Sequence, residues 1–199
     1  NSELKKIISN KTYKYINIAH LTDSVNVLKH YKSINKVFQM TLKEYNSIKP
    51  LKQNPEFCFS AKVDKKKLIK LHYKCYYDDE EYMLNDWDRI INFYFNKKLT
   101  KIKFVCRMQN DVIGACIGWI KHDNKFLFSI CVDPDYRGKG IAKLMLDRFL
   151  QNPPQLSSYL TVFEDNTNAI ALYKKFGYKI RKITNLFCTQ LKLKFCFHC

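Results

Sequence analysis

The chain is poor in arginine, in glycine and in long uncharged stretches, although it carries a large positive charge. Its 199 residues include 35 basic and 18 acidic ones, a net charge of +17, yet only five of the basic residues are arginine. Proteins that recognise guanine edges or bind phosphates through paired hydrogen bonds usually depend on arginine. We therefore interpret the lysine excess as compositional bias on solvated surfaces, and we do not expect nucleic-acid binding.

Long apolar segments are also missing. The sequence holds no run of 18 uncharged apolar residues, and residues 1–6 contain no apolar run of signal-peptide length. These absences predict neither a membrane span nor a secretory leader, and we expect an intracellular, cytoplasmic protein that does not bind membranes. Because the sequence does not begin with Met, a leader removed earlier stays an open alternative.

The eight cysteines do not form the pattern of a disulfide or zinc protein. Six of them lie singly in apolar segments, where a free thiol behaves as a small buried hydrophobe. A chain of this length can build a core without disulfides. The segment 196–199, Cys-Phe-His-Cys, resembles a metal cluster but lacks the second spaced pair of structural zinc sites, so we expect no metal.

Composition predicts one folded domain with an extension. With 46% hydrophobic and 15% aromatic residues, the chain has enough apolar surface to bury a core, which excludes disorder throughout. Residues 1–55 are rich in Lys and Asn, with a strand expected at residues 15–20, and a clearer pattern begins at residue 57. We therefore expect an N-terminal extension of unknown role at residues 1–55 and a domain at residues 56–199.

Hydrophobic periodicity in the second part predicts an α/β arrangement. Apolar residues form short or alternating runs in the expected strands and recur every three to four residues in the expected helices. The strands are expected at residues 57–63, 102–108, 112–120, 126–132, 159–163 and 187–198, and the helices after Asp64, at Asp78, after Pro134, and from Asn166 or Thr167 to just before Gly177. Turns at residues 109–111 and 122–124 predict an antiparallel meander within a mixed sheet.

The most specific segment is residues 129–142, Ser-Ile-Cys-Val-Asp-Pro-Asp-Tyr-Arg-Gly-Lys-Gly-Ile-Ala. A strand enters a short loop with Gly138 and Gly140 and then directly an amphipathic helix. Glycines let backbone N–H groups approach a ligand, and a helix N-terminus adds positive potential there. With the charges of Arg137 and Lys139, the segment predicts a pyrophosphate site. A plain strand-to-helix turn is the alternative, since the spacing is neither that of an NTPase P-loop nor that of a dinucleotide fold.

Two motifs carry a family resemblance. Residues 137–142 resemble the [QR]-x-x-G-x-[GA] signature of the GNAT superfamily of acetyl-CoA-dependent N-acetyltransferases, and residues 162–178 resemble its second motif, an Asn, then Ala, then Leu-Tyr-x-x-x-Gly-[Phe/Tyr]. The resemblance extends from about residue 57 to the C-terminus. It implies an α/β fold with a mixed, mostly antiparallel seven-stranded sheet flanked by helices, in which the two central strands splay apart.

The resemblance also implies where acetyl-CoA binds. The backbone of Ile130, Cys131 and Val132 would pair with the pantetheine amides, and Asn166 and Tyr173 would contact the cofactor near its thioester. The pyrophosphate would be held by Arg137, Gly138, Lys139, Gly140, Ile141 and Ala142. We expect direct acetyl transfer to a primary amine, with Tyr173 as the general acid that protonates the departing thiolate. A core position for Tyr173 is the alternative, and Cys131 is interpreted as a packed or backbone-contributing residue.

The general base departs from the pattern of the relatives that look closest, the ribosomal-protein and peptide N-acetyltransferases. They carry a glutamate on the fifth strand, where this sequence has Thr161. Threonine cannot accept a proton at neutral pH. Glu164, Asp165 or a bound water stay open as the base, and so does a second function, a catalytically weak CoA-binding module with a basic partner-binding surface.

The acceptor is expected near an acidic segment. In the family the acceptor site lies around the first two helices, here near Asp78, Asp79, Glu80 and Glu81, whose carboxylates would attract a cationic amine. Acids at the start of a helix also satisfy its dipole, so the two interpretations stand side by side. A small amine, an amino sugar and a protein or peptide amine are all candidate acceptors, and a homodimer stays open.

Overall fold

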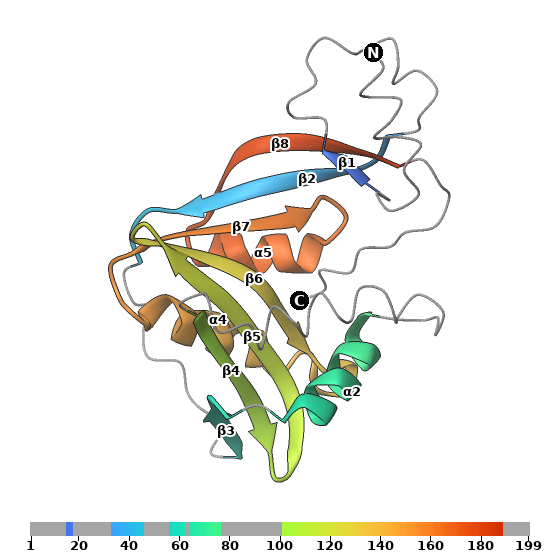
Figure 1. Ribbon diagram of the computed structural model, residues 1–199, viewed down its shortest axis with the longest axis vertical. Helices are drawn as coiled ribbons and strands as arrows, with labels where there is room; N and C mark the ends of the chain where they lie inside the picture. Colours follow the sequence, from blue (N-terminus) through green and yellow to red (C-terminus); the bar gives the residue numbers. More distant parts are fainter. Residues whose placement is uncertain (1–14, 18–32, 46–55, 63, 77–100, 189–199) are drawn as a thin grey trace.

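The computed structural model describes residues 15–17, 33–45, 56–62, 64–76 and 101–188, and these form one sheet with helices on both faces (Figure 1). The strands are β1 (Tyr15–Asn17), β2 (Ser33–Leu42), β3 (Phe57–Ser60), β4 (Lys101–Met108), β5 (Asp111–Lys121), β6 (Asn124–Val132), β7 (Ser157–Phe163) and β8 (Lys179–Cys188). The helices are α2 (Lys65–Tyr76), the 3-10 turn η4 (Pro134–Tyr136), α4 (Ile141–Gln151) and α5 (Thr167–Lys175). No helix within these ranges is long and apolar enough to cross a membrane.

The sheet has the order β1-β8-β2-β7-β6-β5-β4-β3. Every neighbouring pair is antiparallel except β6 and β7, which run parallel at the centre of the sheet. The seven longer strands confirm the expected mixed, mostly antiparallel sheet, and the three-residue β1 adds an eighth at one edge.

The meander of β4, β5 and β6 is confirmed, with tight turns at both tips. Gln109 has φ 52° between β4 and β5, and His122 and Asp123 have φ 47° and 56° between β5 and β6. Positive φ values at the central positions match the right-handed twist of the flanking strands. This part of the fold therefore follows from local sequence.

The two faces of the sheet are covered by different helices. On one face, Leu68 and Leu71 of α2 pack with Val105 and Ile117. The other face lies under α4 and α5 and holds the larger core, in which Phe149 of α4 is fully buried (Figure 1). Close packing there depends on glycine, because a Cβ at Gly118 would lie 2.5 Å from the Phe149 ring.

Three expected helix ends are confirmed. Asp64 Oδ1 accepts a hydrogen bond from the Lys67 amide (2.9 Å) at the start of α2, and Asn166 Oδ1 accepts one from the Ala169 amide (3.1 Å) at the start of α5. Gly177, with φ 91°, follows α5, and the next amide, that of Tyr178, donates back to the Tyr173 carbonyl (3.1 Å). This is the hydrogen-bond pattern that a left-handed residue after a helix permits.

Lys125 is an unexpected buried charge. Its Nζ donates to the carbonyls of Phe149 (3.2 Å) and Leu150 in the last turn of α4, and the Phe149 carbonyl also accepts from the Asn152 amide (3.4 Å). The side chain is fully buried, and this burial lowers the pKa of Lys125 to about 8. The contact ties the end of α4 to the first residues of β6.

Two strands were missed by the sequence analysis. Ser33–Leu42 and Lys179–Cys188 form β2 and β8, which pair with each other, and β2 also pairs with β7. The C-terminal strand was expected at residues 187–198, of which only 187 and 188 are described, and both end β8. The boundary between an extension at 1–55 and a domain at 56–199 stays a prediction; two strands of residues 1–55 belong to the sheet.

Candidate active site

The central strands β6 and β7 separate after a short stretch of pairing. Their register joins residues 124–126 to residues 157–159, while β6 continues to Val132 and β7 to Phe163 (Figure 1). The resemblance implied a splay of the two central strands, and the structure has it. A gap between two parallel strands leaves room for an extended ligand to pair with backbone groups.

The glycine loop follows directly on the splayed end of β6. Gly138 and Gly140 have φ 77° and 79°, and an added Cβ on either would meet no described atom within 4 Å. The first hydrogen bond of α4 runs from the Leu144 amide to the Gly140 carbonyl (3.0 Å). The amides of Ile141 and Ala142 therefore lie outside the helical ladder. Such a loop is open on the outside and lined by amides on the inside, as an anion site requires.

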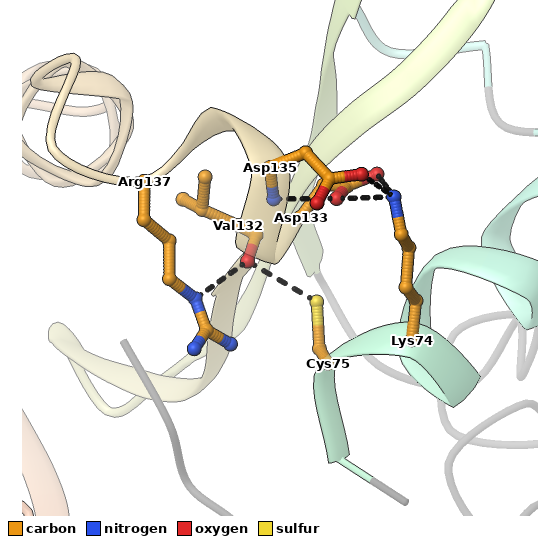
Figure 2. A network of polar contacts seen from close by, with 6 residues as sticks. All are labelled: Lys74, Cys75, Val132, Asp133, Asp135 and Arg137. Carbon is orange, nitrogen blue, oxygen red and sulfur yellow. Dashed lines mark hydrogen bonds and ion pairs between the residues drawn. The ribbon is translucent and has the colours of Figure 1, made fainter.

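An ion-pair network fixes this loop to α2 (Figure 2). Lys74 Nζ lies 2.8 Å from Asp133 Oδ1 and also forms an ion pair with Asp135. Hydrogen bonds to Asp133 and then Asp135 raise the pKa of Lys74 above its ordinary value. Asp133 Oδ1 also accepts from the Asp135 amide (3.0 Å), so one carboxylate holds both η4 and α2.

The Val132 carbonyl at the end of β6 is occupied by side chains (Figure 2). It accepts a hydrogen bond from Arg137 Nε (3.2 Å) and one from the Cys75 thiol (3.3 Å). Lys139 Nζ lies 4.8 Å from the centre of the Tyr136 ring. Arg137 and Lys139, the two cations expected at a pyrophosphate, therefore both contact residues of their own segment. Arg137 contacts the end of β6, the strand with which the pantetheine was expected to pair.

Asn166 and Tyr173 lie on α5, beside the splay. Asn166 uses its Oδ1 as the helix cap, while its Nδ2 is buried and has no hydrogen-bond partner among the described residues. A buried donor of this kind fits a ligand carbonyl. Tyr173 is 5% exposed, and its ring centre lies 5.7 Å from that of Tyr178 in the core under α5. The sequence placed both residues near a cofactor, and the structure puts both on the helix that follows β7.

His72 and Cys131 meet on the opposite face. Both are fully buried between α2 and the sheet, with His72 Nε2 4.0 Å from Cys131 Sγ. Burial lowers the pKa of His72 to about 3, because the charged imidazolium loses its hydration there. His72 is therefore neutral at physiological pH, and the Cys131 side chain belongs to the packing beneath α2.

The candidate bases differ in their surroundings. Thr161 is exposed on β7. Glu164 lies at the start of the next loop, where Lys36 Nζ is 3.7 Å from its Oε2 and the Lys36 amide donates to its Oε1 (3.3 Å). Asp165 is exposed, and its backbone carbonyl accepts from the Thr167 amide (2.8 Å). The Glu164 carboxylate is thus engaged with β2, whereas that of Asp165 faces solvent.

A cavity of about 730 Å³ lies on the face away from α4 and α5. Residues of β2, β5, β6, β7 and β8 line it, among them Thr161, Trp119, Tyr159 and Arg181. The sequence analysis did not predict this cavity because it did not predict β2 and β8. The alternation of apolar and polar residues within 37–42 was the signal that could have indicated β2. The expected acceptor residues Asp78, Asp79, Glu80 and Glu81, and the segment 196–199, lie outside the described residues.

Known proteins resemble this chain in sequence. The family model described as Acetyltransferase (GNAT) family matches residues 65–178. The chain is 34% identical over 64 residues to the peptidyl-lysine N-acetyltransferase YjaB of Salmonella typhimurium, covering 32% of this chain and 43% of that protein. It is 30% identical over 88 residues to the ribosomal protein bS18-alanine N-acetyltransferase of the same species, covering 43% and 55%. The chain thus spans about half the length of these curated relatives.

A solved structure has the same fold. The GCN5-related N-acetyltransferase from Sphaerobacter thermophilus superimposes with a TM-score of 0.64 over 87% of this chain and 57% of that one, at 16% identity. At this identity the likeness concerns the fold alone. Because the family model covers more than half of the sequence, and the splayed strands and the glycine loop lie inside the matched residues, the chain belongs to the GNAT acetyltransferase family.

Proposed function

We propose that this protein transfers the acetyl group of acetyl-CoA directly to a primary amine. The observation that carries the proposal is the meeting of two features along β6. Its pairing with β7 stops at Phe126, and the strand then runs through the open side into the glycine loop that starts α4. One strand therefore offers an extended backbone edge and an anion site at its end, the two surfaces that a pantetheine diphosphate needs.

Three groups of residues fit acetyl-CoA. The amides of residues 138–142 suit the pyrophosphate, since the first turn of α4 has no capping side chain at Gly140. The backbone of residues 130–132 suits the pantetheine amides, and Asn166 Nδ2 is a buried donor for a carbonyl. When bound, acetyl-CoA supplies a thioester, which is an acyl group activated toward amines.

Tyr173 is the proposed general acid. As the amine nitrogen bonds to the acetyl carbon and the carbon–sulfur bond breaks, Tyr173 Oη gives its proton to the departing thiolate, and the base takes the proton that the nitrogen loses. Tyr173 lies about two turns after the N-cap Asn166, so the hydroxyl and the orphan amide belong to one helix and its cap. Burial keeps water from competing for the same proton transfer.

The proposed base, which takes the proton of the amine, is Asp165 or a water molecule. Glu164 accepts from two groups of Lys36, so its carboxylate is the less available of the two acidic candidates. Thr161, in the place of a catalytic glutamate, supports the second candidate function, a CoA-binding module with little turnover. The two functions predict the same cofactor affinity and different thiol release.

The acceptors named for the two relatives are a peptidyl lysine and an alanine of ribosomal protein bS18. We therefore propose a lysine peptide and an alanine-terminated peptide as the first acceptors to test. Isothermal titration calorimetry with acetyl-CoA measures cofactor binding, and release of free CoA thiol across a panel of amines measures transfer. Binding with amine-dependent thiol release supports the acetyltransferase. Binding without thiol release for any amine identifies the module, and absence of binding contradicts both.

A further inference from the structure

The cavity beside Thr161 has an aromatic floor. Trp119 of β5 pairs with Phe126 of β6, and Phe126 pairs with Tyr159 of β7. Their rings are stacked in sequence, with centres 5.3 Å apart at an interplanar angle of 12° and then 5.4 Å apart at 22°. Three neighbouring strands thus present a continuous apolar surface, which suits a flat or chain-like organic body.

A bulge gives the cavity a charged side chain. Thr161 of β7 pairs with Gln39 of β2, which in turn pairs with Lys182 of β8, while Met40 pairs with Ile180. Arg181 is therefore the extra residue of β8. A bulge redirects side chains relative to regular alternation, and Arg181 is found among the residues that line the cavity.

The charged residues among the described cavity lining have one sign. They are Arg181 and Lys43, which follows the end of β2, and both side chains are exposed. Two cations at the rim of an apolar cavity attract an anion. A guanidinium also binds a carboxylate through two parallel hydrogen bonds, which adds geometric selection to the attraction.

Arg181 lies across the sheet from Thr161, beside which the amine of the acceptor would react. β8 lies two strands from β7 in the sheet order, so the backbones of Arg181 and Thr161 are roughly 10 Å apart. The arginine side chain can span part of this distance. An acceptor whose amine lies at the splay and whose other end meets Arg181 therefore has its two polar groups several bonds apart.

We propose that this cavity selects acceptor amines that carry a carboxylate at the end remote from the amine, with an apolar body over Trp119, Phe126 and Tyr159. The inference rests on the proposed function, in that the amine end is the one acetylated. The expectation from Asp78–Glu81 concerns the amine end, whose positive charge those carboxylates would attract. A second group at the remote end of the acceptor therefore tests the cavity and not that segment.

Three probes with one aromatic body test the proposal. They are 4-(aminomethyl)benzoate, benzylamine and 1,4-bis(aminomethyl)benzene, which carry a carboxylate, no second group and a second amine. We expect kcat/KM for the carboxylate probe to exceed that for benzylamine by about tenfold, as a charge-assisted hydrogen bond allows. The diamine is expected to be the poorest acceptor.

Arg181 variants and a matched control locate the effect. Arg181→Gln should remove most of the carboxylate preference, and Arg181→Glu should favour the diamine over the carboxylate. Lys182→Gln makes the same change of charge one residue along β8, at a residue that does not line the cavity, and should keep the wild-type order. Unchanged discrimination in Arg181→Gln, or equal loss in Lys182→Gln, would overturn the proposal.

Binding separates this inference from the proposed function. Calorimetric titration of the three probes into the CoA-loaded protein measures selection without turnover. If the carboxylate probe binds best, and this preference depends on Arg181, but no thiol is released, the carboxylate site is supported and the proposed acetyl transfer is contradicted. Thiol release with other amines, but no preference for the carboxylate probe, supports the transferase and overturns the site. Two further probes distinguish the source of such an acceptor. Transfer to 6-aminohexanoate indicates a free amino acid, and transfer to Ala-Asp-Ala indicates a peptide.

Discussion

The two sides of the splay are built in different ways. The proposed cofactor side comes from one stretch of chain, β6, the glycine loop and α4, followed by β7 and α5. The proposed acceptor side is assembled from five strands, and β2 and β8 lie more than a hundred residues apart in the sequence. A site made of consecutive residues leaves a motif, whereas a site made across a sheet leaves only scattered residues. The proposed cofactor side therefore lies within the residues that the family model matches, whereas β2 and β8 of the proposed acceptor side lie outside them.

The largest effect is expected at the proposed general acid. Tyr173→Phe removes the proposed proton donor while it keeps the ring that packs with Tyr178. We expect kcat to fall at least about 100-fold, the usual contribution of a positioned general acid, with acetyl-CoA affinity unchanged. Steady-state kinetics and calorimetry measure the two quantities. Unchanged turnover would assign Tyr173 to the core alone.

Next in size is the effect of a side chain in the glycine loop. Gly140→Ala puts a Cβ on a residue with φ 79°, which costs about 1–2 kcal/mol and moves the amides out of convergence. We expect acetyl-CoA affinity to fall up to about thirtyfold. Gly177→Ala places a similar strain at φ 91° after α5 and serves as the control. Equal loss of affinity in both variants would mean general destabilisation.

The buried imidazole under β6 makes folding sensitive to acid. The pKa of His72 is about 3 in the folded chain against 6.5 for the free group, so the unfolded chain binds more protons between these values. The contribution to stability is complete above pH 6.5 and is lost as the pH falls toward 3. At pH 5 the loss is about 2 kcal/mol. Urea unfolding of wild type and His72→Leu between pH 4 and 8 measures it, and parallel pH profiles would contradict the assignment.

The smallest effect is expected for the contact between α2 and the loop. Lys74→Gln removes the ion pairs with Asp133 and Asp135, which are largely exposed on the lysine side. We expect a loss of acetyl-CoA affinity up to about fivefold, the range of exposed pairs. Lys70→Gln, an exposed lysine of the same helix, is the control. A larger loss in Lys70→Gln would point to net charge instead of loop position.

Sequence reasoning reached the cofactor side because its signals are local. A glycine loop after β6, a cap at Asn166 or Thr167 and a C-terminal glycine at Gly177 were predicted, and the structure adds the positive φ of Gly138 and Gly140 and the choice of Asn166. The meander followed from turn residues and alternation in the same way. Such features depend on a few neighbours in the chain.

The acceptor side could not be predicted, since it depends on pairing between distant strands. β2 lies in a Lys- and Asn-rich stretch whose composition hides the alternation of Phe38, Met40 and Leu42, and its partners follow only from tertiary contacts. The bulge at Arg181 is a matter of register between β2 and β8, and no local pattern marks it. Burial of Lys125 likewise depends on the end of α4, which is remote in the sequence.

The most direct test of the central claim is a crystal structure of the protein with acetyl-CoA. We expect the pyrophosphate on the amides of residues 138–142, the pantetheine along residues 130–132 between β6 and β7, and the acetyl group on the side of the cavity that holds Thr161. Arg137 should then leave the Val132 carbonyl, to which its Nε donates at 3.2 Å. Acetyl-CoA bound elsewhere, with β6 and β7 enclosing no part of it, would contradict the proposed function.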